Sequence, residues 1–265
     1  MKPEERRERI AAVVREVSRA SVDELASMLE ISRETVRRDL ALLSEQGVLR
    51  KVHGGAVHFQ TAREGTLRDR EASARNEKVA IGRGAARLFE PGDSLFIDAG
   101  TTTSYFAVEL GKVGSFAVIT NSVVIASQLW NARHRSEVYL LGGRYFGENQ
   151  EVVGPLTVEQ VHDLHADHVV LTIGAMDETG TCMDFNADEA FVARAMIARA
   201  HRTTILADSS KLQRHALFQV CEASQIHRLV TEKAPADPLA EALKAAGVEV
   251  IVVDPQAPPL PDEAT

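Results

Sequence analysis

The chain has 265 residues, of which 45% are hydrophobic and 26% charged, a usage that argues against extended disorder. No stretch approaches the roughly 18 consecutive apolar residues of a membrane span. The charged N-terminus, MKPEERRERI, lacks the apolar core of a signal peptide, and two cysteines, Cys182 and Cys221, are too few for a disulfide framework. We therefore expect a cytoplasmic protein that does not associate with membranes.

The net charge of −8 is unevenly distributed along the chain. Residues 1–57 carry 11 Lys/Arg and 10 Asp/Glu, whereas the rest of the chain carries 19 and 28. The acidity thus belongs to the C-terminal part. An acidic bulk domain weakens non-specific DNA binding, but it permits a local basic face elsewhere.

The first thirty residues predict two helices. Residues 4–19 place Ile10 and Val14 on one face of a helix. Ser21 stands three residues before Glu24, the spacing of a capping box, and opens a short second helix.

A third helix follows after a tight turn. Ser32 is the expected N-cap, Val36, Leu40 and Leu43 recur at helical spacing, and Gly47 ends the helix where a left-handed cap is usual. Two β-prone runs around a Gly-Gly pair come next and predict a small hairpin. Three short helices and a hairpin outline a winged helix-turn-helix.

The third helix carries the residues expected to contact DNA. With its apolar side turned inward, its polar N-terminal end faces a major groove. Arginine binds guanine through two nitrogens and also binds phosphate without sequence preference, and basic wing residues reach the backbone. An isolated Arg-Arg pair is more often only a solvated helix face, but the capped helices and the wing favour DNA contact here. The predicted DNA-binding residues are Ser32, Arg33, Glu34, Thr35, Arg37, Arg38, Arg50, Lys51 and His53.

This pattern resembles a known DNA-binding signature. Residues 22–26 (VDELA), 31–40 (ISRETVRRDL) and 53–56 (HGGA), with Leu43 and Gly47, resemble the helix-turn-helix of the DeoR family of transcriptional regulators. One departure is Arg19 and Ala20, where many members carry a glycine before the second helix.

The remainder predicts a larger α/β domain. Residues 59–74 are polar and aperiodic, as in a linker. Apolar runs then alternate with amphipathic segments, which favours a mostly parallel sheet with helices on both faces. The expected strands are 94–98, 116–120, 137–141, 168–173, 203–207, 228–231 and 248–253. The expected domains are 1–58 for DNA binding, 59–74 as linker, 75–254 for effector sensing and oligomerisation, and 255–265 as a Pro-rich tail.

Small, glycine-rich or hydroxyl-bearing residues follow the expected strands, at the edge where open α/β sheets bind ligands. The Gly100–Thr103 loop opens a helix, so free N–H groups and the helix dipole face an anion. A Gly-Thr turn by itself is often only a turn; several such loops on one edge favour a phosphate site. The candidate effector-binding residues are Asp98, Gly100, Thr101, Thr102, Thr103, Asn121, Gly142, Gly143, Glu189, Asp208 and Lys211.

The large domain also resembles the DeoR family. The matching motifs, in order, are 98–103 (DAGTTT), 120–122 (TNS), 141–143 (LGG), 154–155 (GP), 189–190 (EA) and 207–211 (ADSSK). The resemblance implies a fold similar to ribose-5-phosphate isomerase and a phosphorylated sugar as effector. It implies that Gly100–Thr103 hold the phosphate and that Asp98 and Lys211 line the pocket. Residues 181–186 (TCMDFN) depart from the usual composition and are expected to tune the ligand.

Two further signals are discounted. His162, His165 and His168 do not promise the converging geometry of a zinc site, so we expect no metal and no cofactor. Cys182 has no activating partner in the sequence and is expected to be inert.

The sequence therefore predicts a DNA-binding transcriptional regulator, a repressor of carbohydrate-metabolism genes and not an enzyme. Its expected partners are double-stranded operator DNA, a phosphorylated sugar or polyol effector, and further copies of itself in a dimer or tetramer. The alternative is a sugar-phosphate isomerase with an accessory DNA-binding domain, because Asp177, Glu178, Glu189 and Lys211 supply the residue types for a base and a cation. An architectural DNA binder is a third class, but it needs no pocket.

Overall fold

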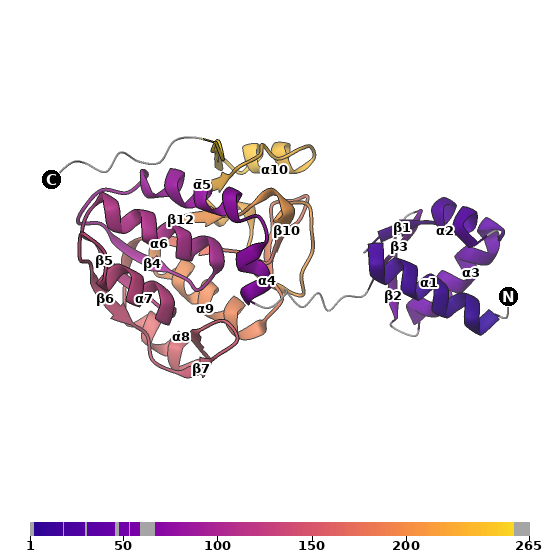
Figure 1. Ribbon diagram of the computed structural model, residues 1–265, viewed down its shortest axis with the longest axis horizontal. Helices are drawn as coiled ribbons and strands as arrows, with labels where there is room; N and C mark the ends of the chain where they lie inside the picture. The colour runs from indigo at the N-terminus through magenta and orange to yellow at the C-terminus, as the bar shows by residue number, and fades with distance from the viewer. Residues whose placement is uncertain are drawn as a thin grey trace. The chain divides into compact units, whose positions relative to one another are not determined.

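The computed structural model describes residues 3–17, 19–29, 31–45, 48–52, 54–58 and 67–256 (Figure 1). The chain divides into two compact units, residues 1–63 and residues 64–265, called here the N-terminal unit and the C-terminal unit. Among the described residues, no helix combines the length and the apolar character needed to cross a membrane.

The N-terminal unit consists of three helices and a small antiparallel sheet of order β1-β3-β2, which confirms the expected winged helix-turn-helix. Ile10, Val14, Val36 and Leu40 are fully buried at its centre, as the helical spacing predicted. The elements are α1 (Pro3–Val17), β1 (Arg19–Ser21), α2 (Val22–Leu29), α3 (Arg33–Glu45), β2 (Leu49–Val52) and β3 (Gly55–His58).

Both predicted helix starts are capped as expected. The N–H of Ser21 donates to Glu24 at 2.7 Å and the N–H of Glu24 donates to the Ser21 hydroxyl at 3.1 Å, which completes the capping box. The N–H of Thr35 donates to the Ser32 hydroxyl at 3.1 Å. These bonds satisfy donors that a helix N-terminus otherwise leaves unpaired.

Strand β1 was not expected from the sequence, and it explains one glycine of the wing. β1 pairs with β3, and a Cβ on Gly55 would lie 2.3 Å from the carbonyl oxygen of Ala20. Only glycine permits so close an approach of two backbones. Gly54 beside it has a positive φ of 78° and forms the turn.

The C-terminal unit is built on a parallel sheet that runs within residues 67–256 in the order β15-β14-β12-β9-β4-β5-β6. Each of its seven strands overlaps one of the expected strands, so the predicted α/β class is confirmed. The strands are β4 (Ser94–Ile97), β5 (Ala117–Thr120), β6 (Glu137–Leu140), β9 (Ala166–Thr172), β12 (Ala200–Leu206), β14 (Arg228–Thr231) and β15 (Glu249–Val252).

Alternating side chains of the sheet pack into two separate cores. Leu95 and Ile97 of β4 face a core shared with α5, α6 and α7, which lie side by side in Figure 1. Phe96, between them, faces the core shared with α8, α9 and α10. This period of two is the geometry of a strand buried on both faces. The helices are α5 (Arg75–Ala86), α6 (Thr101–Val113), α7 (Val123–Trp130), α8 (Pro155–His162), α9 (Ala187–Ala198) and α10 (Leu239–Ala245).

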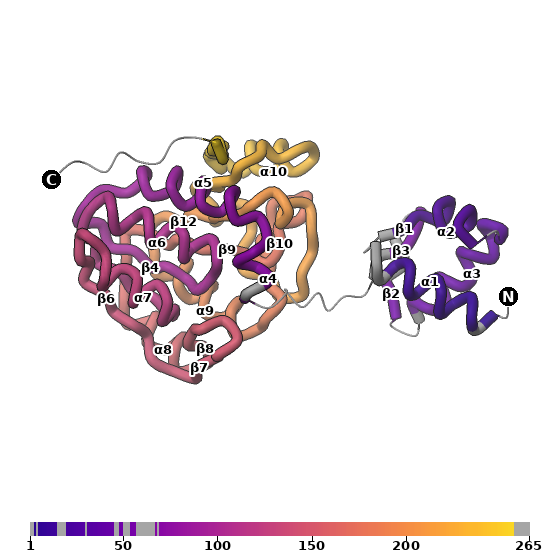
Figure 2. Tube along the Cα trace, viewed as in Figure 1, coloured from indigo at the N-terminus to yellow at the C-terminus, as the bar shows by residue number. Residues whose placement is uncertain are grey.

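Several short elements were not predicted. A hairpin of β7 (Arg144–Phe146) and β8 (Glu151–Val153) lies beside α8 (Figure 2). Helix α4 (Leu67–Ala72) falls inside the segment expected to be linker. The others are β10 (Ala175–Met176), β11 (Cys182–Asp184), β13 (Phe218–Cys221) and two 3-10 turns, η1 (Ser209–Lys211) and η2 (Ala223–Gln225).

The two cysteines of the chain are brought together by this small sheet. Cys182 of β11 stands opposite Cys221 of β13, and both thiols are buried and free. The hydrogen bond with Cys221 and burial raise the pKa of the Cys182 thiol. A protonated buried thiol is a poor nucleophile, so the pairing gives Cys182 a packing partner and no activating one.

Candidate functional site

One face of α3 presents a row of charged side chains to solvent. Arg33, Glu34, Arg37 and Arg38 are exposed, because the helical period turns Val36 and Leu40 into the core. Ser32 is exposed and Thr35 is half-buried at the N-terminal end of the helix. Four charged side chains within six residues, on a helix held by a buried opposite face, form a surface that fits a DNA groove.

The exposed ion pairs of this face are weak. Arg33 lies 2.7 Å from Asp23, and Arg38 lies 3.3 Å from Glu34. Each side chain is well over half exposed, and exposed pairs of this kind contribute little to stability. The guanidinium groups therefore leave these partners at a small cost in free energy.

A buried ion pair holds α3 against α1, and no sequence pattern predicted it. Asp39 accepts hydrogen bonds from Nε of Arg6 at 2.5 Å and from Nη2 at 3.2 Å. Asp39 lies on the helix between the exposed arginines and the core, where it is almost fully buried. Two parallel bonds fix the geometry of a carboxylate–guanidinium pair, so this pair orients the charged face of α3.

The wing residues of the predicted DNA surface are less completely described. Arg50 and Lys51 lie in β2, opposite Val57 and Ala56. His53 lies outside the described residues. Their contacts with DNA stay a prediction.

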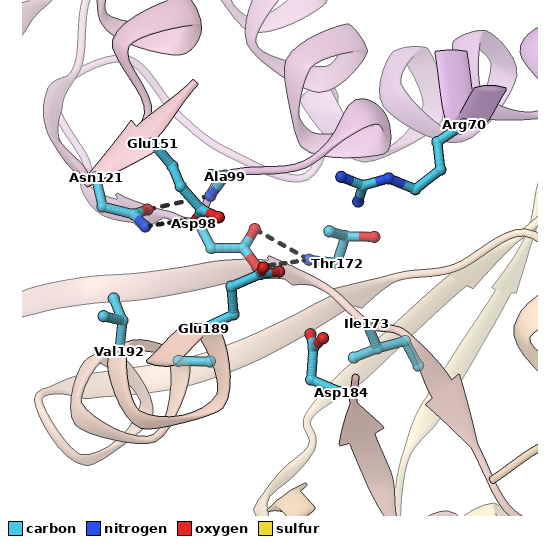
Figure 3. Close-up of a pocket in the computed structure, with 11 residues that line it drawn as sticks. Arg70, Asp98, Ala99, Asn121, Glu151, Thr172, Ile173, Asp184, Glu189 and Val192 are labelled. Atoms are coloured by element: carbon cyan, nitrogen blue, oxygen red, sulfur yellow. Dashed lines mark hydrogen bonds between the residues drawn. The ribbon is translucent and has the colours of Figure 1, made fainter. Parts of the chain in front are cut away.

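The C-terminal unit holds a pocket at the carboxyl ends of β4, β5 and β9, three neighbours in the sheet (Figure 3). This is the edge where open α/β sheets bind ligands. We call it the acidic pocket because four carboxylates line it and, among its described lining residues, Arg70 is the only basic one. Its lining consists of Arg70, Asp98, Ala99, Asn121, Glu151, Thr172, Ile173, Asp184, Glu189, Val192 and Ala193.

The four carboxylates come from four different elements and face one another in Figure 3. Asp98 follows β4, Glu151 begins β8, Asp184 ends β11 and Glu189 lies in the first turn of α9. Burial raises the pKa of Glu151 to about 7, although hydrogen bonds from Asn149 and with Glu189 lower it. At neutral pH Glu151 is therefore partly protonated and both donates and accepts hydrogen bonds.

Asp98 lines the pocket directly after the end of β4. Its two oxygens accept the backbone N–H of Thr172, at 3.0 Å and 3.2 Å. Burial raises the pKa of Asp98 well above its ordinary value, the Thr172 bond lowers it, and the nearby Asp184 and Glu151 raise it further. The hydroxyl of Thr103 also bonds to this carboxyl and lowers its pKa.

Two asparagines connect the carboxylates to the backbone. Asn121, which follows β5, accepts the N–H of Ala99 at 3.1 Å and donates to Glu151 at 3.2 Å. Asn149 donates to Glu151 at 3.0 Å and to Glu189 at 2.8 Å. Carboxyl groups with raised pKa values, held in a polar network at a sheet edge, are typical of ligand sites. Carboxylates and amides together are suited to bind hydroxyl groups.

The predicted effector residues fall into two groups. Asp98, Asn121 and Glu189 line the acidic pocket. The lining does not include the Gly100–Thr103 loop, although its helix α6 begins beside the pocket and Thr103 reaches Asp98. Gly100 has a packing role: a Cβ there would lie 2.2 Å from Cγ2 of Thr172.

The other predicted residues bond within the fold and stay a prediction as ligands. The carbonyl of Gly142 accepts the Thr157 hydroxyl at 2.9 Å, and a Cβ on Gly143 would meet that same hydroxyl. Asp208 caps the turn η1, accepting the N–H of Ser210 at 3.1 Å, and Lys211 ends that turn. None of these four lines the acidic pocket.

Sequence reasoning missed Arg70, Asn149 and Glu151 and reached Asp184 only as part of a tuning segment. Arg70 and Asn149 are 79 residues apart. Both lie in polar stretches where one more polar residue is no signal. Glu151 opens an apolar run, EVV, and an acid at the head of a buried strand is the one local sign that was available.

Comparison with known proteins covers both units. Residues 6–62 match the family described as the DeoR-like helix-turn-helix domain, and residues 73–233 match the DeoR C terminal sensor domain. The chain is 32% identical over 247 residues to the HTH-type transcriptional repressor CsqR of Escherichia coli. The aligned region covers 93% of this chain and 94% of that protein. It is 31% identical over 235 residues to the glycerol-3-phosphate regulon repressor of Haemophilus influenzae, with 89% and 91% covered.

Among solved structures, the ribose 5-phosphate isomerase A of Methanocaldococcus jannaschii is similar over 53% of this chain and 55% of that one. The TM-score is 0.39 and the sequence identity 15%. The likeness concerns the fold of part of the chain. The curated relatives named above are transcriptional repressors by name, and these names favour the regulator over the isomerase alternative.

Proposed function

The chain belongs to the DeoR family of transcriptional regulators, and on that premise we propose that it is a repressor of carbohydrate-metabolism genes controlled by a phosphorylated sugar or polyol. The effector binds in the acidic pocket of the C-terminal unit. Operator DNA binds to the N-terminal unit, and the protein acts in the cytoplasm. The acidic pocket carries the proposal, since it joins hydroxyl-binding acids and one cation at a sheet edge.

The DNA half of the proposal rests on α3. Its N-terminal end enters the major groove, where Arg37 and Arg38 bind guanine edges or phosphates. Arg50 and Lys51 of the wing bind flanking phosphates. The N-terminal unit has nearly equal numbers of basic and acidic residues, so its affinity depends on where these arginines stand and not on bulk charge.

The effector half rests on the chemistry of the pocket. A sugar or polyol offers hydroxyl groups, which both donate and accept hydrogen bonds. The carboxylates accept from such hydroxyls, and a protonated Glu151 or Asp98 donates to them. The relative from Haemophilus influenzae is named for the regulon of a phosphorylated polyol, glycerol 3-phosphate, which makes that compound a natural first probe.

Two copies are needed to read two half-sites on DNA. We therefore propose at least a dimer, assembled through the C-terminal unit. Effector binding favours one arrangement of the paired N-terminal units over another. A ligand shifts such an equilibrium only by its differential affinity for the two arrangements.

The experiment is a titration of the purified protein onto a fluorescent fragment of its own upstream DNA. Salt is held fixed, because phosphate contacts make the affinity steeply salt-dependent. Each titration is run alone and with a panel of phosphorylated sugars and polyols and their unphosphorylated parents.

We expect sequence-specific binding that one phosphorylated compound shifts at least tenfold, about 1.4 kcal/mol of coupling. Specific binding that no compound on the panel alters would remove the effector half of the proposal. Binding equally strong to unrelated DNA would remove the operator half.

A further inference from the structure

The acidic pocket is small. The free volume among its lining residues is about 20 Å³, which is close to the space that one water molecule requires. A phosphorylated sugar or polyol has many more atoms than this space admits. For the proposed function to operate, part of the lining must move when the effector binds.

Arg70 is the part of the lining that closes the pocket from α4. Figure 3 shows its side chain extending from the helix toward the carboxylates. Its Nη2 donates to Oδ1 of Asn149 at 2.6 Å, and Asn149 in turn donates to Glu151 and Glu189. Asn149 thus connects the guanidinium of Arg70 to the acids of the pocket.

Helix α4 is also tied to the body of the unit by its backbone. The carbonyl oxygen of Arg70 accepts a hydrogen bond from Nζ of Lys78 at 2.5 Å, and Lys78 is almost fully buried in α5. The outer residues Asp69, Glu71 and Ala72 are exposed. Polar contacts at Arg70 thus help to hold α4, whose outer side chains are exposed, and a helix with few buried side chains is easier to displace than a core helix.

The charges of the lining assign a role to Arg70. Four carboxylates repel a phosphate, and the only basic side chain among the described lining residues is that of Arg70. Arginine binds a phosphate through two parallel N–H donors, whereas the Asn149 amide oxygen is neutral. A phosphate is the stronger partner, so it displaces Asn149 from the guanidinium.

We propose that Arg70 binds the anionic group of the effector in exchange for Asn149, and that α4 moves with it. Helix α4 begins at Leu67, the first described residue after the segment that leads from the N-terminal unit. Movement of α4 thus reports the state of the pocket to the connection between the units. This inference rests on the proposed function, that the pocket takes a phosphorylated sugar or polyol.

The test measures binding by calorimetry to full-length protein. The probes are glycerol 3-phosphate, fructose 6-phosphate and ribose 5-phosphate, each with its unphosphorylated parent. The variants are Arg70→Gln, which removes the charge, and Arg70→Lys, which keeps the charge but lacks the two parallel N–H donors of a guanidinium group. Arg75→Gln is the matched control, since Arg75 is an exposed arginine at the start of α5 outside the pocket lining. Melting curves establish that each variant is folded.

We expect the native protein to prefer a phosphorylated compound to its parent. Arg70→Gln loses at least tenfold in affinity for that compound, about 1.4 kcal/mol, and keeps its affinity for the parent. Arg70→Lys recovers part of the loss and Arg75→Gln changes nothing. In hydrogen exchange, the amides of α4 exchange faster when the phosphorylated compound is added to the native protein, and they do not respond in Arg70→Gln.

Different results would contradict the role of Arg70, the movement of α4 and the proposed function. Unchanged affinity in Arg70→Gln, or an equal loss for the phosphorylated compound and its parent, overturns the role of Arg70 and leaves the proposed function intact. If the amides of α4 exchange at the same rate with and without the bound compound, the proposed movement of α4 is wrong. Binding of no phosphorylated compound by the native protein overturns the proposed function itself, and this inference with it.

Discussion

The two units of this protein place their functional charges in opposite ways. In the N-terminal unit, the charged residues of α3 come from one short run of the chain and point outward. In the C-terminal unit, the acids of the pocket come from four separate elements and point inward, where burial raises the pKa of two of them. An outward charge keeps its water until a partner replaces it, whereas an inward charge depends on every neighbour that compensates it.

This difference indicates which substitutions should have independent effects on binding or stability and which should have coupled effects. The exposed side chains on α3 form only weak ion pairs, such as those of Arg37 and Arg38 with Glu34, so their effects on binding should nearly add. Pocket residues share hydrogen bonds through Asn121 and Asn149, so a change at one alters the others. Substitutions in α3 and in the C-terminal unit test that contrast, and the largest effect is expected at Arg37 and Arg38.

The first prediction concerns Arg37 and Arg38. Each loses about 1–3 kcal/mol of operator affinity on substitution by Ala if it contacts a base, so the double variant should bind the operator at least about 30-fold more weakly. Fluorescence anisotropy at fixed salt measures this. Arg87→Ala, an exposed arginine of the C-terminal unit, is the control and should leave affinity unchanged. Near-native affinity in the double variant would mean that another face of the N-terminal unit reads DNA.

The second prediction concerns Gly100→Ala. Its Cβ would lie 2.2 Å from Cγ2 of Thr172, and overpacking of this kind costs about 1–3 kcal/mol. The backbone of Gly100 is extended, so the cost comes from crowding, mainly against Cγ2 of Thr172 and to a smaller extent against Oγ1 of Thr103 at 3.1 Å. We expect a melting temperature for the C-terminal unit that is lower by several degrees.

Thr172→Ser is the matched second change, since it removes Cγ2 and keeps the hydroxyl. The double variant Gly100→Ala with Thr172→Ser should recover most of the loss. Failure of this rescue would show that Gly100 is needed for something other than its packing, such as the phosphate loop that the sequence predicts.

The third prediction uses the pKa of Glu151, which is about 7 in the folded protein against an ordinary 4.5. Between these values the folded state holds more protons than the unfolded state. The contribution of Glu151 to stability therefore falls as pH rises from about 4.5 to 7 and is constant above that. Glu151→Gln should make the melting temperature of the C-terminal unit less dependent on pH between 5 and 7. Some slope of the same sign should remain, because the pKa of Asp98 is also raised. An unchanged slope in the variant would place the titration elsewhere.

The smallest effect is expected at Asp23. Its pair with Arg33 is exposed on both sides, so Asp23→Asn should change the stability of the N-terminal unit by less than about 1 kcal/mol. Chemical denaturation measures this. The same variant frees Arg33, and operator affinity should rise slightly or stay the same. A large loss of stability would contradict the view that charges on this face act independently.

Local patterns in the sequence were sufficient for the helices and the wing hairpin of the N-terminal unit, but not for strand β1 or the Arg6–Asp39 pair. The caps at Ser21 and Ser32 and the buried period of Val36 and Leu40 each depend on residues within two helical turns. The same holds for the seven parallel strands, whose apolar runs are continuous because both faces are buried. The exposed arginines of α3 followed from that period without any knowledge of the tertiary fold.

The tertiary structure decided the acidic pocket. The order β9-β4-β5 brings together Thr172, Asp98 and Asn121, and no local rule states which strands become neighbours. Helix α4 carries Arg70 to Asn149 across 79 residues, from a segment whose polar composition predicts only a linker. A helix cap or a buried face is a short-range interaction and leaves its mark in neighbouring residues. A pocket is a set of long-range contacts. Asp98, Asn121 and Glu189 were predicted from their motifs, whereas Arg70, Asn149 and Glu151 become visible only once the chain has folded.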